Sequence, residues 1–269
     1  MALTPSRTDW RRAVDDLLAG FGAWQMWLLL GLNDIRQRYK RSRFGQFWIT
    51  LSTGIFVAGI GIVYAYLFNH PVDEYIPYLS VNIVFWTLVA GILTDSTTVF
   101  TQAGHYLGQQ ALPKTAFVMR VLVRQLLVLA HNVVIIVLVY LAFGVALPAT
   151  AAFVLPALVV LLLAAFLAAI TIGLLCTRFR DLPQIIQSLL QVAFFLTPIM
   201  WRVEQLGDKA HYIVGYNPFA IFLMLVVEPL HGKWPSWDLY GRAFVIIAIM
   251  ALVAAPLFAR FRARIVYWL

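Results

Sequence analysis

The chain has little charge and almost no cysteine. Only 12% of its 269 residues are Asp, Glu, Lys or Arg, while 62% are hydrophobic, a balance far outside the range of soluble globular domains. The single cysteine, Cys176, excludes an internal disulfide and any metal site built from several thiolates. Internal repeats and low-complexity tracts are also absent from the sequence. These features predict one integral membrane domain over residues 1–269, without a metal site.

The net charge of +8 does not indicate nucleic-acid binding. The basic residues stand beside hydrophobic runs and form no separate polar domain, so their placement favours membrane lipids as the partner. The first sixteen residues, MALTPSRTDWRRAVDD, carry charges of both signs and no apolar core next to a cleavage site. We therefore expect no signal peptide and a cytosolic N-terminus.

Long apolar runs predict an all-α fold with six transmembrane helices. They cover residues 49–68, 78–100, 125–147, 151–177, 182–201 and 243–259, and each is long enough to cross the hydrocarbon core. The fourth run is also long enough to tilt, or to bend at Pro156. Residues 212–229 form a shorter run broken at Gly215 and Asn217. This interruption predicts two short re-entrant helices on the outer side, before the last span.

The distribution of basic residues favours this topology with both termini in the cytosol. In that arrangement four of the twenty Lys and Arg residues lie outside, namely Arg202, Lys209, Lys233 and Arg242. A seventh span would move three C-terminal arginines to the outer side, against the positive-inside bias. The sequence therefore favours six spans.

Residues 24–43 predict an amphipathic helix on the inner membrane surface. Apolar side chains recur at helical spacing from Trp24 to Ile35, and this apolar stretch is too short to span a bilayer. Five basic residues follow, namely Arg36, Arg38, Lys40, Arg41 and Arg43. They are suited to anionic headgroups and phosphates; alternatively they only fix the topology.

The polar inner loop between the second and third spans predicts a surface helix over residues 102–110. Its segment GQQALPKT is no phosphate-binding loop, because Pro113 stands where the second glycine is needed and no strand precedes it. The helix would present His105, Tyr106 and Gln109 to another protein. A plain connector remains the alternative interpretation.

Three further sets of residues are candidates for function. Arg178 and Arg180 in a tight inner loop can pair with Asp181 or with a phosphate, or only set the topology. Asp95 and His131 are costly to bury in a membrane; they are candidates for an acid–base pair or for hydrogen bonds between helices. The candidate pore-lining aromatic residues, whose rings can stack on sugars or simply pack, are Tyr64, Phe85, Trp86, Phe194, Phe195 and Trp201.

Three segments together resemble the membrane subunits of ABC exporters that move polysaccharides, among them the O-antigen (lipopolysaccharide) exporter permeases. They are NDIRQRYKRSRFGQFWITLS from Asn33, CTRFRDLPQIIQSLLQVAFFLTPIMW from Cys176, and GYNPF from Gly215. The order of hydrophobic segments also matches, so the resemblance covers essentially the whole chain. One departure is Phe44-Gly45, where the family often has Leu-Gly.

This resemblance implies two copies of the chain around a central pore, each bound to one copy of a separate ABC ATPase that holds ATP and Mg. The chain itself would need no cofactor and have no catalytic residue. The loop helix would be the coupling helix, formed by His105, Tyr106, Leu107, Gln109 and Gln110. The substrate entrance would be formed by Arg36, Arg38, Tyr39, Arg41, Arg43, Phe44, Gly45 and Trp48.

The resemblance therefore implies export of a lipid-linked polysaccharide from the cytosol across the bacterial inner membrane. Capsular or teichoic-acid-type polymers, or a small lipophilic drug, are alternative substrates. A membrane glycosyl- or acyltransferase that uses Asp95, His105 or His131 is the alternative from another class.

Overall fold

The protein is described by a computed structural model that covers residues 5–38, 40 and 42–269, and within these ranges every regular element is helical. The α-helices are α1 (Arg7–Gly22), α2 (Trp24–Arg38), α3 (Phe47–Leu67), α4 (Val72–Ser96), α5 (Gly104–Gln109), α6 (Lys114–Phe143), α7 (Val154–Arg178), α8 (Leu182–Leu196), α9 (Ala210–Val214), α10 (Pro218–Val227), α11 (Trp237–Phe261) and α12 (Ile265–Trp268). Short 3₁₀ segments are η1 (Ala149–Phe153), η2 (Val203–Lys209), η3 (Glu228–His231) and η4 (Arg262–Arg264). The all-α expectation is confirmed.

Five helical segments in the described ranges are long and apolar enough to cross a membrane: α3, α4, α6, η1 with α7, and α11 with its continuation to Trp268. This confirms a multi-pass membrane protein. The expected fifth span, residues 182–201, contains only the 15-residue helix α8, because Thr197 leaves the helical conformation ahead of Pro198. The sixth crossing is therefore not established by helix length.

The third span differs most from its expected bounds. Helix α6 begins at Lys114 and not at residue 125, so Arg120 and Arg124 lie on the helix and not in the inner loop. Pro113, in the loop after the expected surface helix, stands at the N-cap of α6. The helix ends at Gly144, whose φ of 66° suits glycine. Pro156 lies in the first turn of α7, where its missing N–H costs no hydrogen bond.

Helix α4 lies at the centre of the bundle. It packs against α3, α6, α7, α8 and α10, and 67% of its most apolar window is buried, against 22–33% for the other four segments. The remaining helices therefore leave apolar side chains exposed on their outer faces, where lipid or another chain can cover them.

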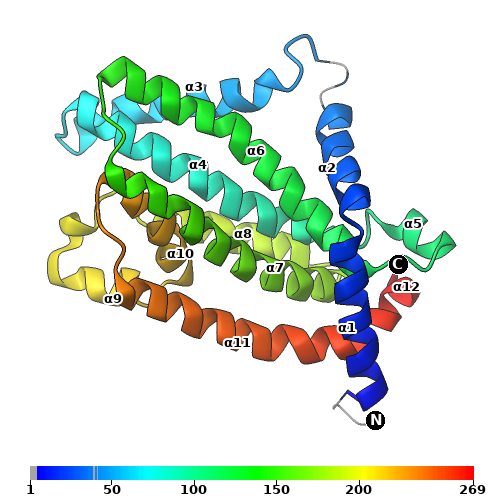
Figure 1. Ribbon diagram of the computed structural model, residues 1–269. Helices are drawn as coiled ribbons and strands as arrows, with labels where there is room; N and C mark the ends of the chain where they lie inside the picture. Colours follow the sequence, from blue (N-terminus) through cyan, green and yellow to red (C-terminus); the bar gives the residue numbers. More distant parts are fainter. Residues whose placement is uncertain (1–4, 39, 41) are drawn as a thin grey trace.

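Helices α1 and α2 run across one end of the bundle, where α1 contacts α6 and α11 and α2 contacts α6 (Figure 1). The amphipathic helix expected over residues 24–43 corresponds to α2, which buries Gly31 and Ile35. Helix α1 was not expected, although Ser6 and Asp9 form a capping box at its start. Both helices lie along one end of the bundle, the orientation that a helix at a membrane surface adopts relative to the spans.

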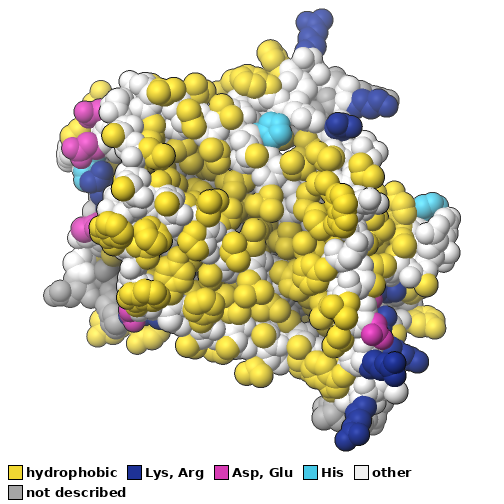
Figure 2. All heavy atoms as spheres, viewed as in Figure 1, with side chains coloured by type: hydrophobic (Ala, Val, Ile, Leu, Met, Phe, Trp, Pro, Cys, Tyr) yellow, Lys and Arg dark blue, Asp and Glu magenta, His cyan; other side chains and the backbone are white. Residues whose placement is uncertain are grey.

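Charged side chains gather at the two ends of the bundle, with a hydrophobic band between them (Figure 2). The end that carries α1, α2, α5 and α12 has most of the Lys and Arg residues and both chain ends (Figures 1 and 2), and we call it the basic end. The opposite end carries Asp73, Glu74 and Glu204. This asymmetry is typical of a protein that follows the positive-inside rule.

Helix α8 and the residues after it carry the chain from the basic end to the opposite end. Arg178, just before α8, lies over the ring of Trp268 in α12. Met200, just after α8, accepts a hydrogen bond from Tyr75 in the first turn of α4. At this opposite end the interrupted segment forms α9 and α10, and Asn217 caps α10 by accepting from Phe219 N and Ala220 N.

Candidate functional site

A groove runs between α3, α4 and α8, and its half near the basic end is the more polar of the two; we call it the polar half. This half has a volume of about 630 Å³. Its wall combines the guanidinium of Arg38 with hydroxyl, carboxylate and amide groups, contributed by Ser52, Thr53, Thr87, Thr94, Asp95 and Gln125. Ser52, Thr53 and Thr87 donate to backbone carbonyls of their own helices. Their hydroxyl oxygens can still accept a hydrogen bond from a ligand.

The other half of the groove is lined mainly by aromatic and aliphatic side chains and has a volume of about 520 Å³. Both halves share Phe56, Trp86 and Phe194, so they form one groove. Tyr64 and Phe195 continue the wall toward the opposite end. Flat aromatic faces next to polar groups are suited to sugar rings as well as to hydrocarbon.

The structure therefore brings four of the six candidate pore-lining aromatic residues together: Tyr64, Trp86, Phe194 and Phe195. Trp86 and Phe194 lie with ring centroids 5.9 Å apart. Phe85 instead is 3% exposed and belongs to the buried core. Trp201 donates from its indole N–H to the carbonyl of Phe195 and does not line the groove.

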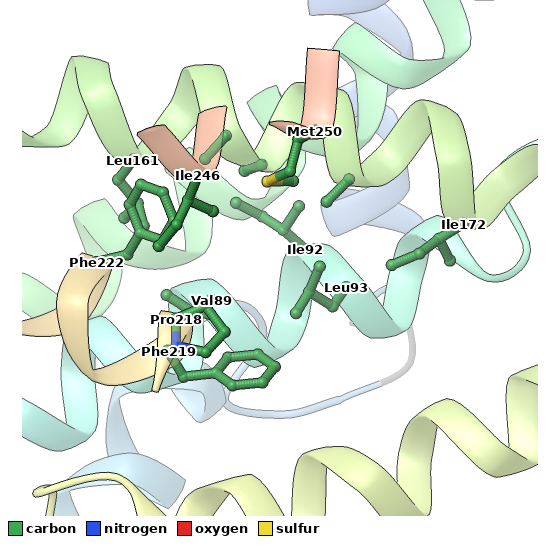
Figure 3. A pocket seen from close by; sticks show the side chains of 13 residues that line it. Val89, Ile92, Leu93, Leu161, Ile172, Pro218, Phe219, Phe222, Ile246 and Met250 are labelled. Atoms are coloured by element: carbon green, nitrogen blue, oxygen red, sulfur yellow. The ribbon is translucent and has the colours of Figure 1, made fainter. Parts of the chain in front are cut away.

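A separate crevice of about 340 Å³ lies between α4, α7, α10 and α11 (Figure 3). Ile92, Leu161, Phe222 and Met250 are among the side chains that line it, and every lining side chain is apolar. It offers no partner to a hydroxyl or a phosphate, so it is no candidate site for a polar substrate, whereas the groove is one.

A ladder of ion pairs lies beside the polar half of the groove and joins α2 to α6 and α4. Arg120 binds Asp34 through two contacts, Nε to Oδ2 at 2.7 Å and Nη2 to Oδ1 at 2.5 Å. Arg124 donates to Asp34 at 3.2 Å and to Asp95 at 2.7 Å. All four side chains are at most 15% exposed. Charges so far removed from solvent need a partner, and here each carboxylate has a guanidinium beside it.

The acid–base pair considered for Asp95 and His131 is not formed. Asp95 binds Arg124 and accepts from the amide of Gln125, while the Nδ1 atom of His131 faces the carbonyl of Leu127 one turn earlier in the same helix. Asp95 therefore acts in contacts between helices, and the residues considered for catalysis do not converge on one point.

The basic residues considered for the substrate entrance are exposed at the basic end. Arg36, Arg38 and Arg43 form no ion pair within the described part of the chain, and Arg38 reaches the groove. Phe44 and Trp48 stack at 5.9 Å on either side of Gly45, whose φ is 53°. Tyr39 and Arg41 lie outside the described residues.

Helix α5 presents the side chains that the coupling-helix interpretation requires. Leu107 is 4% exposed and anchors α5, whereas Tyr106 is 44% exposed. His105, Gln109 and Gln110 are also exposed. In the inner loop Arg178, Arg180 and Asp181 are exposed, and no ion pair joins them in the residues described.

The sequence did not reveal that Asp34 of α2 pairs with two arginines of α6. Asp34 stands in the middle of the basic helix, where a lone carboxylate signals an ion pair, but its partner is 86 residues away. Asp16, which binds the first turn of α6, was also missed. Neither long-range contact has a local sequence signature.

Residues 25–230, which contain α2, the groove, the ion-pair ladder and α10, match the family model described as ABC-2 type transporter. The chain belongs to the ABC-2 type transporter family. It is accordingly the membrane permease of an ABC transporter. The matched range excludes α1 and α11, which pack against each other at the basic end.

Two individual proteins are also similar to this chain. Both are O-antigen export system permease proteins RfbA of Klebsiella pneumoniae, 18% and 20% identical to this chain over 232 residues. Each alignment covers 86% of this chain and 90% of the relative. This ABC-2 permease is thus similar to them over nearly its whole length.

Proposed function

We propose that this permease moves a lipid-linked polysaccharide, of the O-antigen type, from the cytosol across the bacterial inner membrane. The observation that carries the proposal is the groove, which has a basic and polar mouth beside α2 and an aromatic wall beyond it. The relatives named for O-antigen export support the same substrate class.

We take the basic end as cytosolic because Lys and Arg accumulate on that side of inner-membrane proteins. In this orientation both termini are cytosolic, and α8 with residues 197–200 supplies the sixth crossing. This sixth crossing is supported by two contacts: Arg178, before α8, lies over Trp268 at the basic end, and Met200, after α8, binds Tyr75 at the opposite end. Helices α9 and α10 would then dip in from the outer side.

A lipid-linked glycan would bring its diphosphate to the exposed arginines of α2 and of the following turn. Guanidinium groups suit phosphate oxygens because they donate two parallel hydrogen bonds. The first sugars would then bind the polar half of the groove and stack on Phe194. The chain would bind and guide the substrate without chemical catalysis.

A second copy of the chain would complete the conduit. Helices α3 and α8 border the groove and carry exposed apolar side chains, including Ile55, Val63, Leu189 and Phe195. Facing α3 and α8 of another copy would enclose the groove. ATP and Mg would be bound by a separate ATPase subunit seated on α5.

Copurification tests the assembly. A tagged chain co-expressed with its partner ABC ATPase is expected to yield a complex of two permeases and two ATPases. Replacing His105, Tyr106 and Gln109 together by alanine should remove the ATPase and leave the permease folded, whereas Asp15→Ala at the same end should not. A wild-type chain that retains no ATPase contradicts the proposal.

A further inference from the structure

Asp16 of α1 is a buried carboxylate that binds two other parts of the chain, the start of α6 and the residues after α11. Its side chain is 2% exposed. It accepts hydrogen bonds from the backbone N–H groups of Lys114 and Thr115, at 3.2 and 3.0 Å, and from the Thr115 hydroxyl at 2.9 Å. The Nε of Arg262, after α11, lies 3.3 Å from it.

The two amides belong to the first turn of α6, whose N–H groups have no partner inside the helix. The residue at the N-cap is Pro113, which has no side-chain acceptor. Asp16 takes that role from another helix, and its negative charge also favours the positive end of the α6 dipole. The start of α6 therefore depends on α1.

The two helices touch along their backbones at this place. Gly20, one turn after Asp16, packs so closely on Thr115 that an added Cβ would lie 2.5 Å from the Thr115 Cβ. This spacing leaves no room for α1 to slide or turn on α6 without breaking the contact. We therefore expect a movement of the first turn of α6 to carry α1 with it.

Helix α5 ends at Gln109, directly before this turn, and only residues 110–113 separate it from α6. Leu269 lies against Gly104 at the start of α5. Arg262 lies close to the same C-terminal segment, so α1, α5, α6 and the end of α11 meet within one small region of the basic end (Figure 1).

We propose that Asp16 is a positioning residue that transmits the movement of α5 to α1 and α2, and so couples ATP hydrolysis in the partner to opening of the groove. The inference rests on the proposed function, since it assumes that an ATPase acts on α5. Asp16 contacts neither substrate nor nucleotide in this account. It holds the start of α6 to the surface helices.

The first test uses the full-length permease alone in nanodiscs. In a Cys176→Ser background, spin labels at Ala19→Cys and Gln109→Cys, both exposed positions, report the distance between α1 and α5. We expect a narrow distance distribution that broadens in Asp16→Ala and is intact in the matched control Asp15→Ala. An unchanged distribution in Asp16→Ala overturns the proposal. This test needs no ATPase, so it remains decisive if the proposed function fails.

The second test uses the assembled transporter and measures glycan exported per ATP hydrolysed. Asp16→Ala is expected to lower this ratio by about fivefold or more, the lower range of energetic coupling between sites, while ATP hydrolysis and complex size are retained. Asp16→Asn keeps one acceptor oxygen and the side-chain volume, so an intermediate ratio is expected even if the alanine variant folds poorly. A wild-type ratio in both variants shows that Asp16 only stabilises the fold and overturns the proposal.

Discussion

Arg120 binds Asp34 through two contacts of 2.7 and 2.5 Å, and this pair fixes α2 to α6. Each side chain is 14% exposed, so neither charge has water to replace its partner. The contact explains how a helix that lies along the end of the bundle is held to the helices that cross it. Together with Asp16, it makes α6 the common support of both surface helices.

Removing the carboxylate of this pair should destabilise the permease. In Asp34→Ala the guanidinium of Arg120 loses its partner and Arg124 keeps only Asp95, and breaking a buried pair costs about 3 kcal/mol. We expect a clearly lower melting temperature in detergent. Asn33 is the neighbouring exposed residue, and the control Asn33→Ala should leave the melting temperature almost unchanged. Equal melting temperatures for wild type and both variants would show that the Asp34–Arg120 pair does not contribute to stability.

Arg38 is expected to serve the substrate entrance, because it is the α2 arginine that lines the groove. Arg38→Glu would repel a diphosphate and should reduce surface polysaccharide strongly without reducing the amount of permease in the membrane. Arg36→Glu makes the same charge change outside the groove and should have a smaller effect. Normal surface polysaccharide in Arg38→Glu would remove this arginine from the mechanism.

We expect export to depend on the aromatic side chains that line the groove, and not on apolar side chains of α8 that lie outside it. Phe194 lines both halves of the groove, whereas Val192 on the same helix is 56% exposed and lies outside the groove lining. We expect Phe194→Ala to lower export several-fold with ATPase binding retained, and Val192→Ala to change little. Export assays in which both substitutions act alike would exclude a specific role for the groove.

The opposite end should lose stability in acid. Burial, together with the smaller effect of the nearby Lys233 and Arg202, lowers the pKa of His231 from 6.5 to about 4. The fold thus holds a neutral imidazole, while the unfolded chain binds a proton below pH 6.5. Stability conferred by the neutral form is present above this pH and is lost as the pH falls from 6.5 to 4. Melting curves across this window should show the loss, and His231→Phe should make it shallower; parallel curves would contradict the assignment.

The sequence allowed the membrane class, most helix positions and the family to be predicted, because hydrophobic length and charge distribution are local signals. It misplaced the start of α6, because the uncharged run begins only at residue 125, after Arg120 and Arg124. Their partners, Asp34 and Asp95, lie far away in the sequence, and pairing with them is what lets two arginines enter the helix bundle.

The sequence predicted which types of residue form the candidate site better than which of those residues lie together. Tyr64, Trp86, Phe194 and Phe195 were singled out by composition and do share the groove, but the same reasoning chose Phe85. Adjacent residues on a helix point to different sides, so Trp86 faces the groove and Phe85 the core. Only the packing of α4 against its neighbours decides which of these two residues lines the groove.

The most direct test of the account is transport in vesicles that contain only this permease and its ATPase. The account predicts that lipid-linked polysaccharide added on the ATPase side becomes accessible to a glycan-degrading enzyme on the other side when ATP is present, and that Arg38→Glu strongly reduces this. A glycan that stays on the ATPase side with wild-type subunits and ATP, or that crosses equally well without the ATPase, would contradict it.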